Sequence, residues 1–402
     1  MHPLIKILYS STIGAIWLWR KFVSIVVYIG FKPAKAYIQK IFRNAGVEMN
    51  GKAPHDLVVH NDWFYHRFAY DGTLGFAESY LNGWWDCKQL DEMFSKLLRG
   101  GVYLKLPPWE KFIHYLNFDV FNLQTAALDS ETADLHYNQG NEVFKSFMDA
   151  NMIYTCGYWK DAKNLDEAQI HKMDLIGRKL KLKPGMRVLD VGCGWGGLCK
   201  FLAERFGVQM TGVTNSKEGV KEGRLRCKGL NVDIRLQDYR QINEQFDRIV
   251  TVGFFEHVGR KNHRSFIELA HRCLSDDGIF LIQTIGLDHE GSPPVDLFMT
   301  KYFFPSFQLP DHKNIPKAID NLFCIEDWQN FGPDYDRTLM AWHDNFVKNW
   351  HTISHKFENP DFIYRMWKYL FCLCAGAFRA RRAQLWQIVL TKGLKGGYVS
   401  VR

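Results

Sequence analysis

Apolar and polar positions change their rhythm along the chain near residue 180. From there on, short apolar runs alternate with amphipathic stretches of helical period. The apolar runs are RVLDVG, QMTGVT, DIRLQD, DRIVTVG, GIFLIQTIG and, close to the end, LWQIVLTK. Between them lie GGLCKFLAERF, SKEGVKEGRLRC, SFIELAHRCL and a last helix over about 361–382. This alternation predicts an α/β fold, a doubly wound, Rossmann-like parallel sheet with helices on both faces.

The rest of the chain lacks this alternation. Residues 44–103 predict short helices around an aromatic cluster, most clearly in ESYLNGWWDCKQLDEMFSKLL. The stretch GGVYLKLPPWEKF has two glycines and two prolines and predicts a domain boundary. The stretch from 287 to about 345 is aromatic and irregular, which indicates a lid or a substrate wall. We therefore expect an apolar basic segment 1–36, a smaller N-terminal helical domain 37–103, a linker 104–130 and a catalytic domain 131–402.

The first 36 residues form two apolar runs, ILYSSTIGAIWLW and FVSIVVYIGF, separated by Arg20 and Lys21. A membrane-spanning helix needs about 20 apolar residues, so neither run is long enough. No acid precedes Glu48, whereas the chain up to that residue has seven basic residues: Lys6, Arg20, Lys21, Lys32, Lys35, Lys40 and Arg43. This pattern favours a helix that lies in the headgroups of an anionic membrane surface. A span that tolerates the basic pair and an ordinary docked helix are the alternatives, and a cleaved signal peptide is disfavoured.

Composition narrows the class of protein. A chain of 402 residues can bury a large core, and its aromatic content of 15% indicates large apolar surfaces. The net charge of +8 favours an anionic partner, either nucleic acid or acidic lipid. The nine cysteines form no paired C-x-x-C pattern, so we expect no metal, no disulfide framework and a reducing, cytoplasmic compartment.

The stretch VLDVGCGWGG places Gly192, Gly194 and Gly196 directly behind a predicted strand. Such a loop alone is a weak sign of a nucleotide site, and a glycine turn that only packs helix on strand is the alternative. A nicotinamide cofactor would require an acid at the end of the second strand, which instead ends in Thr214. Asp190 in the glycine loop fits S-adenosylmethionine better, with Asp238 or its neighbour Tyr239 at the adenine.

Polar residues follow each predicted strand at the edge where ligands bind in doubly wound sheets. They are Asp190, Thr214, Asp238, Glu256 and Gln283. This line of side chains predicts the position of the site.

A set of motifs then resembles one family, the cyclopropane-fatty-acyl-phospholipid synthases, which includes mycolic acid cyclopropane synthases and related fatty-acid methyltransferases. The motifs are GWGGL, GVTNS, QDYR, FDRIV, FFEHVG, FGPDYDRTLMAWH and CAGAFRAR, with ESYLNGWWDC and LKLPPWEKF in the smaller domain. The resemblance covers about 40–402 and leaves the first 35 residues outside.

The resemblance implies that a methyl group passes from S-adenosylmethionine to a cis double bond in an acyl chain of a membrane phospholipid. Loss of a proton then closes a cyclopropane ring, with a bound bicarbonate ion as the base. The smaller domain would bind lipid, and the protein would lie at the inner face of the membrane as a peripheral protein. A homodimer is compatible with the family, and nucleic acid is not an expected partner.

Roles for individual residues also follow from the resemblance. Tyr154 and Thr155 would lie near the cofactor, and Cys156 would contact bicarbonate. Glu256 would lie beside the reacting methyl group and the ion, while Tyr335 would hold the ion near the Ile285 backbone. Cys374 matches the cysteine regarded as the active one in the family, although a cysteine in such an apolar helix more often only packs.

Two positions depart from the family pattern. Gln283 stands where the family commonly has histidine, and its amide can donate a hydrogen bond to bicarbonate but cannot carry a proton. Gly219 stands where the family has glutamine, so a ribose contact is expected to be lost. Gln283 therefore supports one alternative, a methylated or methylenated chain without ring closure. A catalytically silent scaffold and a nucleic-acid methyltransferase are weaker alternatives.

Overall fold

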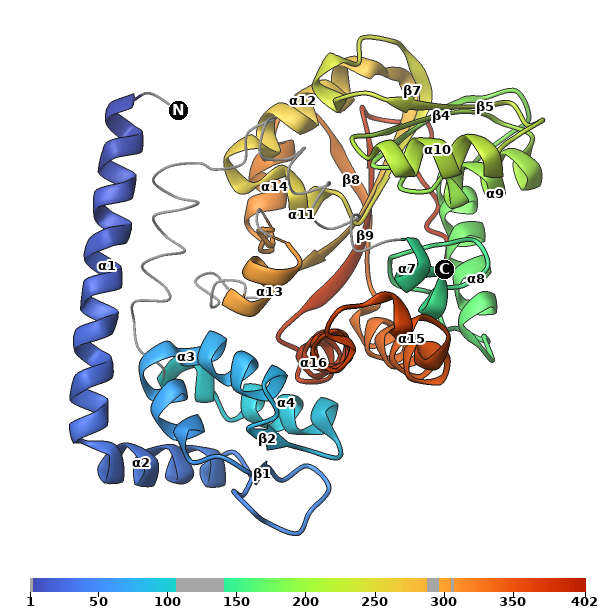
Figure 1. Cartoon of the computed structure of the whole chain (residues 1–402). Helices are drawn as coiled ribbons and strands as arrows, with labels where there is room; N and C mark the ends of the chain where they lie inside the picture. Colours follow the sequence, from blue (N-terminus) through green and yellow to red (C-terminus); the bar gives the residue numbers. More distant parts are fainter. Residues whose placement is uncertain (1–2, 106–140, 288–295, 305–306) are drawn as a thin grey trace. The chain divides into compact units, whose positions relative to one another are not determined.

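The computed structural model describes residues 3–105, 141–287, 296–304 and 307–402, which divide into two compact units (Figure 1). The helical unit holds 3–105, 296–304 and 354–380, and the sheet unit holds 141–287, 307–353 and 381–402. The helical unit thus takes two helices from the second half of the chain, which the sequence had assigned to the catalytic domain. Most of the predicted linker 104–130 and the start of the predicted catalytic domain lie outside the described residues.

The sheet unit is built on a seven-stranded sheet in the order β5-β4-β3-β6-β7-β9-β8. Its strands are β3 (Arg187–Val191), β4 (Gln209–Thr214), β5 (Val232–Leu236), β6 (Phe246–Val252), β7 (Leu274–Gly286), β8 (Cys324–Asn330) and β9 (Gln384–Thr391). The first five strands in this order pair in parallel, which confirms the predicted α/β class. The predicted parallel pairing does not extend to β9, which pairs antiparallel with both β7 and β8.

Helices cover both faces of this sheet. They are α7 (Asn141–Phe147), α8 (Leu165–Lys179), α9 (Gly197–Phe206), α10 (Lys217–Arg226), α11 (Phe255–Val258), α12 (His263–Cys273), α14 (Asn314–Ile319) and α15 (Gly332–Ile353). Alternate strand residues face opposite sides. Val188 packs with side chains of α8, α9 and α10, whereas its neighbour Leu189 packs with side chains of α11, α12 and α14. The sheet therefore has two apolar cores.

The segment predicted to be irregular, 287 to about 345, is largely regular where the structure describes it. It contains α14, the edge strand β8 and the first turns of α15. The prediction of irregular structure was wrong there. CIEDWQN forms a strand at the sheet edge and buries few of its side chains, so its apolar alternation is weak. Residues 288–295 and 305–306 of this segment lie outside the described residues.

The helical unit has an aromatic core. Its helices are α1 (Pro3–Ile29), α2 (Phe31–Asn44), α3 (Trp63–Leu81), α4 (Leu90–Arg99), α13 (Leu297–Tyr302) and α16 (Pro360–Arg379), with short strands β1 (Val58–Val59) and β2 (Trp85–Asp86). Phe76 contacts the rings of Phe64, Trp85, Phe94 and Tyr369. These packed rings account for part of the high aromatic content.

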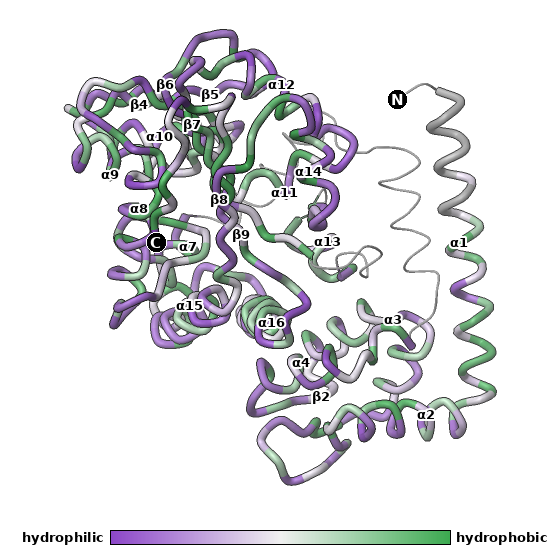
Figure 2. Tube along the Cα trace, turned by 180° about the vertical axis from the view of Figure 1, so that it is seen from behind, coloured by the Kyte–Doolittle hydropathy of each residue, from purple (hydrophilic) through white to green (hydrophobic). Residues whose placement is uncertain are grey.

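The N-terminal segment folds as the single helix α1 of 27 residues, followed by α2. Figure 2 shows that the coloured part of α1 is largely apolar. Arg20 forms an ion pair with the buried carboxylate of Asp71 on α3, and the ring of His66 contacts the Ser24 carbonyl at 2.9 Å. Among the described residues, no single helix has the length and apolar character to cross a membrane; α1 from Gly14 and α2 meet that test only as a pair bent by 94°.

Candidate active site

The glycine loop between β3 and α9 has its open side at Gly194. Gly192 and Gly194 have φ values of +87° and +53°, in the left-handed region that favours glycine. A Cβ at Gly192 would lie 2.7 Å from the Phe254 ring, whereas a Cβ at Gly194 would have no heavy atom within 4 Å. The backbone at Gly194 can therefore be approached closely by a ligand, as the sequence predicted for the cofactor loop.

The other polar residues predicted for the cofactor lie at the carboxyl ends of β3, β4 and β5. Thr214 ends β4, and its hydroxyl accepts a hydrogen bond from the Ser216 N–H at 3.2 Å. Asp238 follows β5 and pairs with the Arg240 guanidinium at 2.9 Å. Tyr239 is buried against Phe254, with ring centroids 5.6 Å apart. The parallel pairing thus places these residues along one edge, and their contacts with a cofactor stay predictions.

Asp190 is the most enclosed of these residues. It lies in β3, is 2% exposed and accepts a hydrogen bond from the Cys199 thiol at 3.4 Å. Burial raises the pKa of its carboxyl to about 7. A buried carboxylate at the start of the glycine loop needs a positive partner, and Lys172 on α8 supplies a nearby charge.

The segment Tyr154–Cys156 lies beside the carboxyl end of β6. The Thr155 methyl group occupies the space next to Gly253, where an added Cβ would come within 2.6 Å of Thr155 Cγ2. The Tyr154 ring stacks on Trp342 of α15 with centroids 5.1 Å apart. The same indole contacts the Tyr335 ring edge-on at 6.1 Å.

Cys156 is fully buried, and its thiol contacts a side chain of α15. Its thiol donates to the Gly157 carbonyl at 3.1 Å, and the Thr338 hydroxyl lies 3.9 Å from its sulfur. Burial raises the pKa of this thiol well above its ordinary value, so the group is a neutral thiol. Because Thr338 and Tyr335 are one turn apart on α15, the structure brings Tyr154, Cys156 and Tyr335 together around this helix.

Glu256 lies in the short helix α11, directly after β6, and is 1% exposed. Its Oε1 accepts a hydrogen bond from the Ile285 N–H at 2.6 Å, while its Oε2 has no hydrogen-bond partner among the described residues. Burial raises the pKa of the carboxyl to about 7. The neighbouring His257 packs on Phe307, and burial lowers the pKa of its imidazole to about 4, so it is neutral.

Gln283 lies in β7 with a fixed amide orientation. Its Oε1 accepts a hydrogen bond from the Nε2 of Gln387 at 2.9 Å, which leaves its own Nε2 without a partner among the described residues. The Gly253 N–H donates to the Gln283 carbonyl at 2.9 Å, so Gln283 is adjacent to the residue that contacts Thr155. Gln283 thus offers an unpartnered N–H donor and Glu256 an unpartnered carboxylate oxygen among the described residues, and these are the kinds of group that can bind an oxyanion carrying one O–H, such as bicarbonate.

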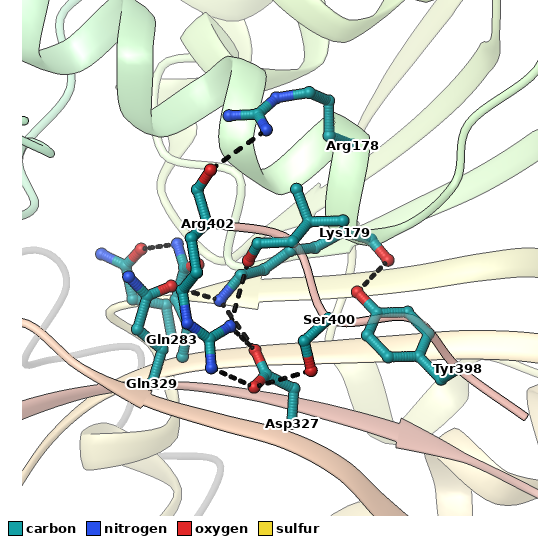
Figure 3. Close-up of polar contacts among 10 residues, drawn as sticks. Arg178, Lys179, Gln283, Asp327, Gln329, Tyr398, Ser400 and Arg402 are labelled. Atoms are coloured by element: carbon teal, nitrogen blue, oxygen red, sulfur yellow. Dashed lines mark hydrogen bonds and ion pairs between the residues drawn. The ribbon is translucent and has the colours of Figure 1, made fainter.

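The sequence did not reveal the polar row that continues from Gln283 across the sheet. Gln283, Gln387 and Gln329 stand opposite one another on β7, β9 and β8. The fully buried Lys179 donates to Gln329 Oε1 at 2.7 Å and pairs with Asp327 (Figure 3). The spacing of Asp327 and Gln329 on alternate positions of CIEDWQN was the available signal, but it required recognition of β8 as a strand.

Cys374 belongs to α16 of the helical unit, whereas the other four residues predicted to be catalytic belong to the sheet unit. Burial raises the pKa of its thiol to about 12, and the nearby Asp296 carboxylate acts in the same direction. The group is thus a neutral thiol at pH 7, which agrees with a packing role. Arg379 on the same helix pairs with Asp91 at 2.6 Å, so its charge is already matched.

Gly219 lies in the first turn of α10, against the glycine loop. Its N–H donates to Ser216 Oγ at 3.0 Å, and an added Cβ would lie 2.7 Å from the Gly194 carbonyl oxygen. In this chain the position therefore has no room for the glutamine of the family pattern unless the loop moves.

The chain has a seven-stranded sheet of this order, a glycine loop after β3 and polar residues at the carboxyl ends of the strands. These features define it as an S-adenosylmethionine-dependent methyltransferase. It resembles the solved mycolic acid cyclopropane synthase CmaA1 in complex with SAH and CTAB, at 30% identity and a TM-score of 0.61 over 65% of this chain and 98% of that one. The family model described as mycolic acid cyclopropane synthetase matches residues 124–388, and the chain belongs to this family.

The sequence similarity to known proteins extends beyond the sheet unit. The chain is 45% identical to the cyclopropane-fatty-acyl-phospholipid synthase of Escherichia coli (strain K12) over 89% of its own length and 93% of the relative. It is also 33% identical to a protein of Pseudomonas putida named "Probable fatty acid methyltransferase", over 67% of its own length and 71% of that protein. The family resemblance inferred from the sequence motifs is confirmed.

Proposed function

We propose that this enzyme transfers a methylene group from S-adenosylmethionine to the cis double bond of acyl chains in membrane phospholipids and closes a cyclopropane ring. The observation that supports ring closure is that Glu256 Oε2 and Gln283 Nε2, an acceptor and a donor that could hold bicarbonate, are both buried and have no hydrogen-bond partner among the described residues. Membership of the family and the name of the Escherichia coli relative support the substrate class.

An alkene is a weak nucleophile, so the sulfonium of the cofactor must supply the driving force and the protein must align the two reactants. The burial of Glu256 and Cys156 keeps water away from the cation that forms after methyl transfer. Bicarbonate, when bound, supplies the base that removes a proton from the added methyl group. Gln283 Nε2 would donate to that ion, Glu256 Oε2 would accept its O–H, and the neutral Cys156 thiol and the Tyr335 phenol would complete its surroundings.

The outer face of α1 supports binding to a membrane surface. Leu18, Phe22, Ile25 and Ile29 recur at helical spacing, and each is at least half exposed. The opposite side of α1 faces α3 through Arg20, so the apolar face is presented away from the rest of the helical unit. Such a face, on a helix that carries Lys21 and no acid, fits an anionic lipid surface.

Gln283 favours one second function, transfer of the methyl group without ring closure, because an amide cannot relay a proton. The two functions add the same single carbon to the chain. Only the ring product lacks a double bond.

The test is incubation of the purified enzyme with S-adenosylmethionine, bicarbonate and vesicles of a monounsaturated phospholipid. The proposal expects lipids that gain one CH2 by mass spectrometry and resist ozonolysis, since a cyclopropane has no double bond to cleave. Products of the same mass that ozone cleaves would identify the second function, and vesicles left unchanged would refute both.

A further inference from the structure

Lys172 on α8 is a buried cation that none of the steps above uses. Its side chain is 1% exposed, and its Nζ donates a hydrogen bond to Thr155 Oγ1 at 2.9 Å. Burial of an ammonium group is costly unless opposite charges or hydrogen bonds compensate it. Here the carboxylates of Asp149 and Asp190 and the Cys156 thiol face the ammonium group.

The charged groups around Lys172 belong to two different parts of the site. Asp149 accepts hydrogen bonds from the N–H groups of Asn151 and Ile153 at 2.8 and 2.9 Å, which fixes the turn that leads into Thr155. Asp190 lies at the start of the glycine loop. Lys172 thus lies between the turn on one side and the glycine loop on the other.

A second residue of α8 holds the same segment. The Gln169 amide, one turn before Lys172, donates to the Thr155 carbonyl at 2.8 Å and to the Ile153 carbonyl at 3.3 Å. α8 therefore fixes both the backbone and the side chain of Thr155.

The direction of the Thr155 hydroxyl follows from its two contacts. Its methyl group is next to Gly253, so the rotamer is set, and its oxygen accepts from Lys172. Because an ammonium group only donates, the hydroxyl proton must point toward another acceptor. Among the described residues, the structure gives that O–H no acceptor.

The turn also packs on the beginning of α9. A Cβ at Gly197 would lie only 2.1 Å from the Asn151 carbonyl oxygen, so the turn and the first residue of this helix are in close contact. The N-terminus of a helix favours an anion because its N–H groups and dipole point toward it. A carboxylate bound at the glycine loop would therefore lie at the α9 N-terminus, on which the turn that leads into Thr155 packs.

We propose that Lys172 is a positioning residue for the methyl donor, which directs the Thr155 hydroxyl toward the carboxylate of the methionyl part of S-adenosylmethionine. This inference rests on the proposed function only in that the cofactor binds at the glycine loop. The ammonium adds a positive charge beneath that carboxylate in a site shielded from solvent, where charge interactions are stronger than in water.

The test is calorimetric binding of S-adenosylhomocysteine, without lipid, to the full chain and its variants. Lys172→Met and Thr155→Val should each weaken binding by about tenfold or more, as expected for loss of a hydrogen bond to a charged group. The double variant should be about as weak as the weaker single variant, since both changes break one chain of contacts. Thr155→Ser keeps the hydroxyl and should bind within about threefold of the wild type.

The pH dependence gives a readout that a purely structural role would not produce. Burial lowers the pKa of Lys172 to about 8, against the opposing influence of Asp149, Cys156 and Asp190. The affinity of the wild type should therefore fall as the pH rises from 7.5 to 9.5, as the charge is lost. Lys172→Met should retain only the slope that comes from titration of the ligand and of Asp190, whose pKa Lys172 lowers in the wild type.

Wild-type affinity in Lys172→Met, or additive effects in the double variant, would overturn the inference while cofactor binding and the proposed function stand. No binding by the wild type would instead refute the cofactor site. If Lys172→Met fails to fold, Thr155→Val and the wild-type pH profile decide: an unchanged affinity in Thr155→Val, or a flat wild-type profile, would refute the role of Lys172.

Discussion

Glu256 and Ile285 are joined by a 2.6 Å hydrogen bond from the backbone N–H of β7 to one carboxylate oxygen of α11. This contact fixes the carboxylate at the end of the sheet and leaves its Oε2 without a partner among the described residues. One carboxylate oxygen of Glu256 therefore fixes the side chain, and the other can bind a ligand.

Glu256→Gln should lower the rate of lipid modification by at least about a hundredfold, because the amide keeps the shape but loses the negative charge that would bind the O–H of the ion. The measurement is turnover on unsaturated phospholipid vesicles. S-adenosylhomocysteine binding should stay within a few-fold of the wild type, which shows that the fold and the cofactor site are intact. A variant that retains its turnover would remove Glu256 from the mechanism.

The same substitution should alter how stability depends on pH. Burial raises the pKa of Glu256 to about 7 in the folded protein, against 4.5 for the ordinary carboxyl. The folded wild type thus binds the proton more tightly, and this contribution to stability is present below pH 4.5 and lost as the pH rises through 7. The free energy of unfolding of the wild type relative to Glu256→Gln should fall across this range. Parallel denaturation curves of the two proteins at every pH would contradict the raised pKa.

Gly194→Ala should abolish or strongly weaken cofactor binding without a clash inside the protein. A Cβ there meets no heavy atom within 4 Å, so a methyl group enters only the space predicted for the cofactor. Gly229→Ala is the matched control, because Gly229 also has a positive φ and an open Cβ position but lies in the turn after α10. Both variants should lose similar stability, about 1 kcal/mol, and only Gly194→Ala should lose S-adenosylhomocysteine affinity by calorimetry. Equal affinities would place the cofactor elsewhere.

Gly219→Gln, which restores the family pattern, should impair this enzyme. The new Cβ would come within 2.7 Å of the Gly194 carbonyl, so either α10 or the glycine loop must shift. Overpacking of this kind costs about 1–3 kcal/mol. Thermal unfolding and cofactor affinity should both decline, whereas Glu218→Gln at the neighbouring exposed position should change neither. A gain in affinity would mean that the ribose contact outweighs the packing.

Ile25→Asp should weaken binding to anionic vesicles in a flotation assay. Ile25 is 60% exposed on the apolar face of α1, so the substitution adds a charge to that face without disturbing a core. Leu225→Asp on α10 is the matched control, because this leucine is 64% exposed on another surface. Equal flotation of both variants and the wild type would refute the membrane role of α1.

The sequence predicted the class of fold and most strands, because apolar runs between amphipathic helices have a strong period. It missed β8, since the side chains of this edge strand are mostly polar and partly exposed. It also assigned α16 to the catalytic domain, because chain order does not show that this helix packs against α4 in the helical unit.

Within the site, the motifs predicted residues that the structure brings close together, such as Tyr154, Cys156 and Tyr335. They did not reveal Lys172 or Lys179, because lysine is usually a surface residue and only the fold shows which ones are buried. The orientation of the Gln283 amide depends on Gln387, which is 104 residues further along the chain. Such a contact has no local signal in the sequence.

Bicarbonate dependence of ring formation tests the proposed chemistry most directly. Ozone-resistant product would be measured on unsaturated phospholipid vesicles in buffer freed of carbon dioxide, with and without added bicarbonate, for the wild type and Gln283→His. We predict that ring formation by the wild type falls by about a hundredfold on depletion and returns with the ion, and that Gln283→His is equal or faster at saturating bicarbonate. Undiminished ring formation without bicarbonate, or a methylated product that ozone still cleaves, would contradict the role assigned to Glu256 and Gln283.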